Sequence, residues 1–220
     1  MIIINSPHNP TGSVLTAEDL EAIAQVAIER DVWVLTDEPY SKMVYDGEFA
    51  SILSVDGMKE RTILLDCFSK SFAMTGWRLG YGVMHRDLAA QIAKLQTNCN
   101  SCTTSFVQRA GIAALTGPME PSLAMVAEFK QRRDVIVDGL NSIPGISCLR
   151  PHGAFYVFPN ITATGLDSRA LAGRILEEAN VAVLSGTAFG QYGDGYLRLS
   201  YANSVENIQE AVRRIGELLS

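Results

Sequence analysis

The sequence predicts an α/β fold, in which a doubly wound, mostly parallel sheet is followed by a smaller α+β unit. Three observations carry this prediction. Short apolar runs alternate with helical patterns early in the chain, as in strand-helix-strand units. The run TILLDCF (62–68) is nearly continuously apolar, as in a parallel strand buried on both faces. After a long helical pattern over residues 122–140, the order of elements changes.

The first strand is expected at residues 2–5, and the Pro/Asn/Gly cluster at 6–12 predicts a loop. Thr16 and Asp19 have the spacing of a capping box, which starts a helix. The apolar residues expected on the buried face of this helix are Leu20, Ile23, Ala24, Ala27 and Ile28.

The next strands are expected at 32–36, at 62–68 and within GWRLGYGVMH (76–85). Asp87 can cap a following helix. That helix is predicted to bury Leu88, Ile92 and Leu95.

The second unit follows the long helix and the turn NSIPG (141–145). Strands are expected in ISCLRPHGAFYVFP and YLRLSY, with helices over 168–179 and 204–219. The last helix has one apolar stripe, formed by Val205, Ile208, Val212, Ile215 and Leu219. We place the domain boundary inside the long helix, which gives domains 1–127 and 128–220.

Composition argues against several classes of partner. The 220 residues carry a net charge of −6, and their lysines and arginines are scattered, so a nucleic-acid or anionic-membrane footprint is not expected. No apolar run approaches the roughly 20 residues of a membrane span, and the start does not resemble a signal peptide. A cytoplasmic location is therefore the expectation.

The cysteines and histidines do not predict a metal site. Cys99 and Cys102 have the CxxC spacing of a redox dithiol or half a zinc site, but no second pair or nearby histidine completes it. The three histidines, His8, His85 and His152, are far apart and lack ligand spacing.

Polar residues whose side chains can react or bind a ligand follow three of the predicted strands. Asn9 follows the first strand, Asp37 and Tyr40 the second, and Ser69 and Lys70 the third. Ligands of open α/β sheets bind at the carboxyl ends of the strands. Taken singly, each residue has an ordinary explanation, because asparagine forms turns, aspartate caps helices and lysine is usually solvated.

Together with Arg78, these residues stand in a wider pattern: NSPHNPTG, LTDEPY, SKSFAMTGWRLGY, PHGAFYVFP, SGTAFG and YLRLSYA, in this order. In this pattern the chain resembles the pyridoxal-phosphate-dependent aminotransferases of classes I and II, which have fold type I. The resemblance implies that residues 1–127 are the second half of a doubly wound, mostly parallel cofactor-binding sheet. Residues 128–220 are then the small α+β C-terminal domain.

By this resemblance, Lys70 forms the Schiff base with pyridoxal 5′-phosphate and moves the proton during catalysis. Asp37 pairs with the pyridine nitrogen, and Asn9 and Tyr40 bind the phenolic oxygen of the cofactor. Tyr40 thus joins Lys70 and Asp37 as a catalytic residue.

The resemblance also implies that Ser69 and Arg78 hold the cofactor phosphate. Cys67 stands where the family usually has a phosphate-binding serine, and a thiol is the weaker donor. Arg198, helped by Asn9, binds the α-carboxylate of the substrate. Without the resemblance, a surface ion pair would explain Arg198 as well.

The implied function is transfer of an amino group between an amino acid and a 2-oxo acid by a homodimeric enzyme. A β-lyase or synthase of the same fold is an alternative, because the cofactor can also drive loss of a leaving group. The resemblance begins in the middle of the family's cofactor domain, so we expect the N-terminal half to be absent. A catalytically silent fragment, or a subunit that depends on a partner, is therefore a third interpretation.

Overall fold

A computed structural model describes residues 1–220, which form two compact units. Unit 1 comprises residues 1–7 and 14–124, and unit 2 comprises residues 8–13 and 125–220. The division falls between Ala124 and Met125, inside helix α4 (Glu120–Asn141), which also contains the predicted boundary. The loop 8–13 belongs to unit 2, although the residues on either side of it in the sequence belong to unit 1.

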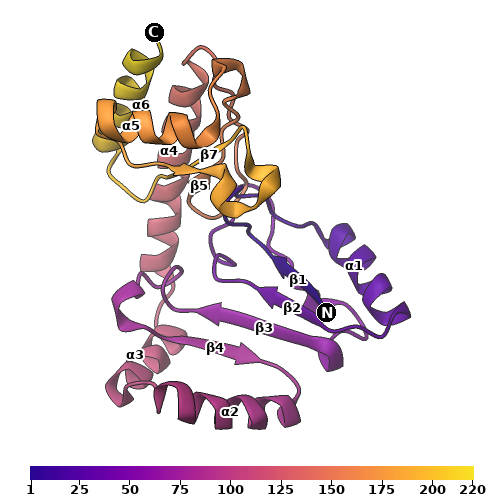
Figure 1. Cartoon of the computed structure of the whole chain (residues 1–220). Helices are drawn as coiled ribbons and strands as arrows, with labels where there is room; N and C mark the ends of the chain where they lie inside the picture. The colour runs from indigo at the N-terminus through magenta and orange to yellow at the C-terminus, as the bar shows by residue number, and fades with distance from the viewer. The chain divides into compact units, whose positions relative to one another are not determined.

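Unit 1 contains one four-stranded sheet in the order β1-β2-β3-β4 (Figure 1). Its strands are β1 (Ile2–Asn5), β2 (Val34–Asp37), β3 (Thr62–Cys67) and β4 (Gly80–Val83). The first three strands are parallel and β4 is antiparallel to β3, so the predicted mostly parallel sheet is confirmed. The carboxyl ends of β1, β2 and β3 therefore share one edge of the sheet.

Helix α1 (Ala17–Glu29) begins with the predicted capping box between Thr16 and Asp19. Its buried residues form the core of unit 1 with side chains from β2 and the segment 52–58. This core consists of Leu20, Ala24, Ala27, Val34, Ile52 and Met58. Ile28, predicted to be buried, is 44% exposed, because it lies at the edge of the apolar stripe.

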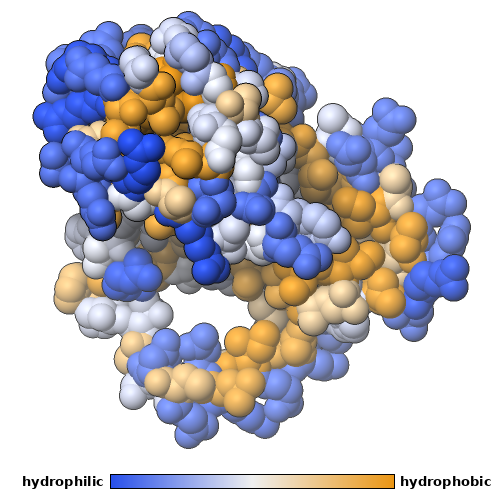
Figure 2. Space-filling view, turned by 45° about the horizontal axis from the view of Figure 1, so that its top comes forward, coloured by the Kyte–Doolittle hydropathy of each residue, from blue (hydrophilic) through white to orange (hydrophobic).

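Helices α2 (Arg86–Asn100) and α3 (Ser105–Thr116) follow β4. The N-cap of α2 is His85 rather than Asp87, which lies in the first turn. The predicted burial on α2 is wrong, because the helix has no buried residue and Leu95 is 63% exposed. In Figure 2, orange apolar residues reach the surface in the lower part of the view, where β4 and α2 lie in Figure 1. Helix α3 was not predicted.

Unit 2 combines most of α4 with two further helices and a small antiparallel sheet. Helices α5 (Ser168–Ala179) and α6 (Val205–Leu219) match their predicted ranges. The sheet has the order β5-β7-β6. Its strands are β5 (Tyr156–Val157), β6 (Leu184–Ser185) and β7 (Leu197–Ser200).

The long strand predicted over residues 146–159 is reduced to β5, because main-chain groups of Cys148 and Pro151 bond to side chains of α4 instead of to a neighbouring strand. Strand β6 was not predicted. None of the helices combines the length and the apolar character that crossing a membrane requires.

Candidate active site

The first group of candidate residues lies in unit 1, at the carboxyl ends of β2 and β3. Asp37 is the last residue of β2, and Tyr40 lies buried in the turn that follows. Lys70 follows β3, and its Nζ atom lies 5.7 Å from the centroid of the Tyr40 ring. The two strands are parallel neighbours, so their ends bring a carboxylate, a phenol and an amine to one edge of the sheet.

Asp37 is a half-buried carboxylate with one side-chain donor and no ion-pair partner. Asn5, its register partner in β1, donates from Nδ2 to Asp37 Oδ2 at 3.3 Å and to the Asp37 main-chain oxygen at 2.8 Å. Burial raises the pKa of Asp37, and the negative charge of Asp66 raises it further. A positively charged group placed here would reverse this effect, so the site suits a cationic ring nitrogen.

The turn after β3 carries the remaining unit 1 candidates. Ser69 and Lys70 are half-buried, and Ser71 is 3% exposed with a hydroxyl that has no hydrogen-bond partner. Arg78 is exposed, has a left-handed backbone (φ 54°) and donates from Nη1 to the Thr75 carbonyl at 2.8 Å. The structure therefore ties the Arg78 guanidinium to its own turn. Ser71 was not predicted, and its orphan hydroxyl is visible only in three dimensions.

The second group of candidates lies in unit 2, around Arg198 of β7. Leu197 and Leu199 are buried, as the predicted alternation requires, and Arg198 points to the opposite face. The guanidinium carbon lies 4.6 Å from the Tyr156 ring centroid and 4.9 Å from that of Phe189. Tyr156 lies in the motif PHGAFYVFP and Phe189 in SGTAFG, but no feature of these motifs predicts that their rings pack on Arg198.

Arg198 also contacts Asn9, which is 189 positions earlier in the sequence. Its Nη1 donates to Asn9 Oδ1 at 3.1 Å, whereas its buried Nε has no partner. Aromatic rings cover the guanidinium but accept no in-plane hydrogen bond, so donors remain for a ligand. A planar guanidinium with unused donors suits a carboxylate.

The loop 8–13 holds Asn9 in place. Its ends are joined by hydrogen bonds from the Gly12 amide to the His8 carbonyl (2.7 Å) and from the His8 amide to the Ser13 carbonyl (2.8 Å). His8 Nδ1 also bonds Thr11 Oγ1 at 2.7 Å, and burial lowers the pKa of His8. The loop is thus closed on itself around Asn9.

The remaining motifs do not form a site of their own. Cys99 and Cys102 are free, exposed thiols. No cluster of three or more histidine, cysteine or acidic side chains has the arrangement to hold a metal ion.

The chain matches a known family model along almost its whole length. The model described as aminotransferase class I and II covers residues 1–215. A putative aminotransferase, YugH, of Bacillus subtilis is 44% identical over 218 residues, which are 99% of this chain and 56% of the relative. The aromatic-amino-acid aminotransferase 2 of Thermococcus litoralis is 43% identical, with 99% of this chain and 57% of the relative covered.

Solved structures agree with this match. An aromatic aminotransferase from Pyrococcus horikoshii superposes with a TM-score of 0.96 at 44% identity, covering 99% of this chain and 59% of that one. The aspartate aminotransferase of Thermus thermophilus with maleate gives 0.91 at 37% identity, covering 98% and 56%. The chain spans 56% to 57% of the two curated relatives named above. The chain belongs to the class I and II aminotransferase family.

Proposed function

We propose that this chain serves in the transfer of an amino group between an amino acid and a 2-oxo acid, with pyridoxal phosphate bound covalently to Lys70. The observation that carries the proposal is the meeting of Lys70, Tyr40 and Asp37 at adjacent ends of parallel strands. Relatives named as aspartate and aromatic-amino-acid aminotransferases support it. The proposal extends to a homodimeric, cytoplasmic enzyme.

When bound, pyridoxal phosphate supplies an electron sink for the pair left at the substrate Cα after proton loss. Lys70 provides the nitrogen that holds the cofactor and afterwards accepts and returns the Cα proton. Asp37 keeps a proton on the ring nitrogen, and its raised pKa falls once that cation is in place. The half-buried position of Asp37 strengthens this pairing by limiting water.

The other cofactor contacts divide between two ends of the ring. Tyr40 and Asn9 donate to the phenolic oxygen, and the orientation of Asn9 fits this role because its Oδ1 already accepts from Arg198. Ser69 and Arg78 hold the phosphate, which requires Arg78 to exchange its bond to Thr75 for the anion. Cys67 adds little to phosphate binding because a thiol is a weak donor.

Arg198 binds the α-carboxylate of the substrate. Its aromatic neighbours shield the guanidinium from water while leaving its donor edge for two carboxylate oxygens. The contact from Asn9 fixes the plane of the guanidinium before the substrate arrives. Arg198 recognises any α-carboxylate, so it does not select the side chain of the amino acid.

Chemical trapping tests the covalent assignment. Incubation with pyridoxal phosphate, borohydride reduction and peptide mapping should place the reduced label on Lys70. A label found instead on Lys94 or Lys130 would refute the assignment. Consumption of a 2-oxo acid that depends on an amino acid separates aminotransfer from lyase chemistry, which needs no amino acceptor.

Two arginine variants test the division of roles. Arg198→Leu should weaken amino-acid binding by about 2–5 kcal/mol, because it leaves a ligand carboxylate unpaired, and should leave cofactor binding largely intact. Arg78→Leu should chiefly weaken the cofactor. Titration of each variant with pyridoxal phosphate and then with amino acid measures both affinities. Equal losses of cofactor affinity would contradict the proposed roles.

A further inference from the structure

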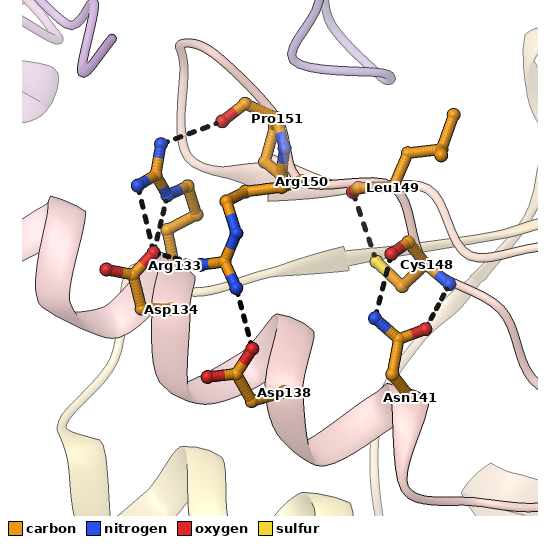
Figure 3. A network of polar contacts seen from close by, with 8 residues as sticks. All are labelled: Arg133, Asp134, Asp138, Asn141, Cys148, Leu149, Arg150 and Pro151. Carbon is orange, nitrogen blue, oxygen red and sulfur yellow. Dashed lines mark hydrogen bonds and ion pairs between the residues drawn. The ribbon is translucent and has the colours of Figure 1, made fainter.

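Arg133 is a buried charged residue of unit 2 that lies outside the candidate site. It is 2% exposed on α4, and its guanidinium is paired with Asp134, where Nη2 lies 2.9 Å from Oδ1. Its Nη1 donates to the main-chain carbonyl of Pro151 at 3.1 Å (Figure 3). A charged side chain buried this deeply destabilises the fold unless its donors are hydrogen-bonded. Loss of the bond to the Pro151 carbonyl would therefore be unfavourable.

The chain before Pro151 is fixed to the same helix. Arg150 pairs with Asp134 and with Asp138, whose Oδ1 lies 2.7 Å from Nη2, and Figure 3 shows both carboxylates on one side of α4. One turn further on, Asn141 accepts from the Cys148 amide at 2.7 Å and donates to its carbonyl at 2.9 Å. Among these contacts, the bond from Arg133 is the one that reaches Pro151, where the segment leaves the helix.

Beyond Pro151, the chain docks on the loop that carries Asn9. The amides of His152 and Gly153 both donate to the Gly12 carbonyl, at 3.0 and 2.9 Å. Gly12 has φ +69°, and a Cβ atom there would lie 2.4 Å from Pro151 Cβ. The fit between Gly12 and Pro151 therefore tolerates almost no displacement of either segment.

The same segment also reaches Arg198 directly. Three residues after Gly153 comes Tyr156, whose ring lies against the Arg198 guanidinium. Residues 151–156 thus touch both supports of Arg198, namely the Asn9 loop and the Tyr156 ring. A displacement of Pro151 would shift the Asn9 loop through the close contact between Pro151 and Gly12.

We propose that Arg133 is a positioning residue for the carboxylate-binding Arg198, acting through the Pro151 carbonyl, Gly12 and Asn9. This inference rests on the proposed function, because it assumes that Arg198 binds a carboxylate. Arg133 touches neither substrate nor cofactor in this scheme. Its effect is to hold the Asn9 loop where Asn9 fixes the guanidinium plane, and small displacements at such sites are costly.

The test measures carboxylate binding by calorimetry on the cofactor-loaded protein, with maleate and 3-phenylpropionate as probes that carry no amino group. Arg133→Met should raise Kd about three- to tenfold, the effect of losing one ordinary hydrogen bond. Arg132→Met is the matched control, because Arg132 is the next residue of α4 and pairs with Glu128 at 3.0 Å instead. It should bind as wild type.

A double variant separates positioning from general damage. If Arg133 acts through Asn9, then Arg133→Met should add less than about a twofold increase in Kd to Asn9→Ala. Fully additive effects would overturn the inference. Gly12→Ala leaves the side chain of Arg133 unchanged and should raise Kd by a similar factor. If Arg133→Met does not fold, Gly12→Ala alone provides the test. Unchanged binding by Gly12→Ala would also overturn it.

Arg198→Leu distinguishes the two proposals. If it leaves both probes bound as in wild type, the proposed carboxylate role of Arg198 is wrong, and the role of Arg133 falls with it. If it abolishes binding while Arg133→Met binds normally, only the positioning role is wrong.

Discussion

Helices α2 and α3 of unit 1 differ from α5 and α6 of unit 2 in how they use their apolar side chains. α2 has no buried residue, and α3 buries only Val107 and Gly111. Three large apolar side chains of α3, Phe106, Ile112 and Leu115, are more than half exposed. In unit 2, α5 buries four of its residues, and α6 leaves none of its large apolar side chains exposed. Apolar periodicity therefore predicts that a helix forms, but burial depends on whether a partner surface is present.

The two units also differ in their electrostatics. Asp37, Glu38 and Asp66 of unit 1 all have a raised pKa, chiefly because burial disfavours their charged forms. In unit 2, Glu178 and Glu210 have a lowered pKa because arginines bond to them. Unit 1 thus holds acidic groups whose charged form is disfavoured near its candidate site, whereas carboxylates of unit 2 form exposed ion pairs.

The largest expected effect contrasts two leucines in helices of the two units. Leu171 of α5 is 0% exposed, whereas Leu115 of α3 is 60% exposed. Leu171→Ala should lower the free energy of unfolding by about 2–5 kcal/mol through lost burial and a cavity. Leu115→Ala should change it by less than about 0.5 kcal/mol. Urea unfolding followed by far-ultraviolet circular dichroism measures both, and equal losses would show that α3 is buried against a partner in solution.

Much of the fold follows from the sequence because local signals agree with the tertiary structure. The capping box at Thr16 and the apolar stripe of α6 are examples, since each depends on residues three or four positions apart. The structure of segment 146–159 could not be predicted, because side chains of Asn141 and Arg133 in α4 bond to its main chain in place of a neighbouring strand. Such long-range competition for backbone groups has no local signature.

The candidate site also contains some residues that could be predicted from the sequence and others that could not. Asp37, Tyr40 and Lys70 could be placed together because neighbouring parallel strands end at one edge. The aromatic rings around Arg198 could not be placed beside it, because Phe189 ends a short 3-10 helix (Gly186–Phe189) whose position depends on the folded unit. The buried hydroxyl of Ser71 and the buried charge of Arg133 likewise could not be predicted, since no local sequence pattern marks either residue.

A smaller effect tests the raised pKa values of unit 1. Asp66 accepts hydrogen bonds from Tyr81 Oη (2.9 Å) and the Cys67 amide (2.6 Å), but burial still raises its pKa. The fold therefore favours the protonated form, a contribution that is present below the unfolded pKa of about 3.9 and lost as the pH rises through the raised value. Asp66→Asn keeps an acceptor without the charge, so it should stabilise unit 1 at pH 7.

The fluorescence of Trp33 and Trp77, both in unit 1, follows this unit during urea unfolding between pH 3.5 and 8. The advantage of Asp66→Asn should shrink toward pH 3.5, where the wild-type carboxyl becomes protonated. A variant that is less stable than wild type at pH 7 would mean that the charged hydrogen bonds outweigh burial.

The smallest effect concerns the exposed ion pairs of unit 2. Glu210 bonds to Arg213 and Arg214 at 2.7 and 2.8 Å, and these contacts lower its pKa to about 2. The folded state thus favours the charged form, so the contribution to stability is present above the unfolded pKa and lost as the pH falls toward 2. Glu210→Gln should lower the urea midpoint only slightly at pH 7, because exposed pairs are screened by water and side-chain motion.

Salt identifies the origin of this small loss. In 1 M NaCl the Debye length falls to about 3 Å, so the difference between Glu210→Gln and wild type should nearly vanish. Glu177→Gln, on the exposed side of α5 and outside any ion pair, is the matched control and should not change the midpoint in either buffer. A loss from Glu210→Gln that persists undiminished in high salt would indicate that Glu210 contributes through packing or hydrogen-bond geometry rather than charge. The acids of unit 1 would still be buried groups whose charged form is disfavoured, but the carboxylates of unit 2 could no longer be described as screened ion pairs.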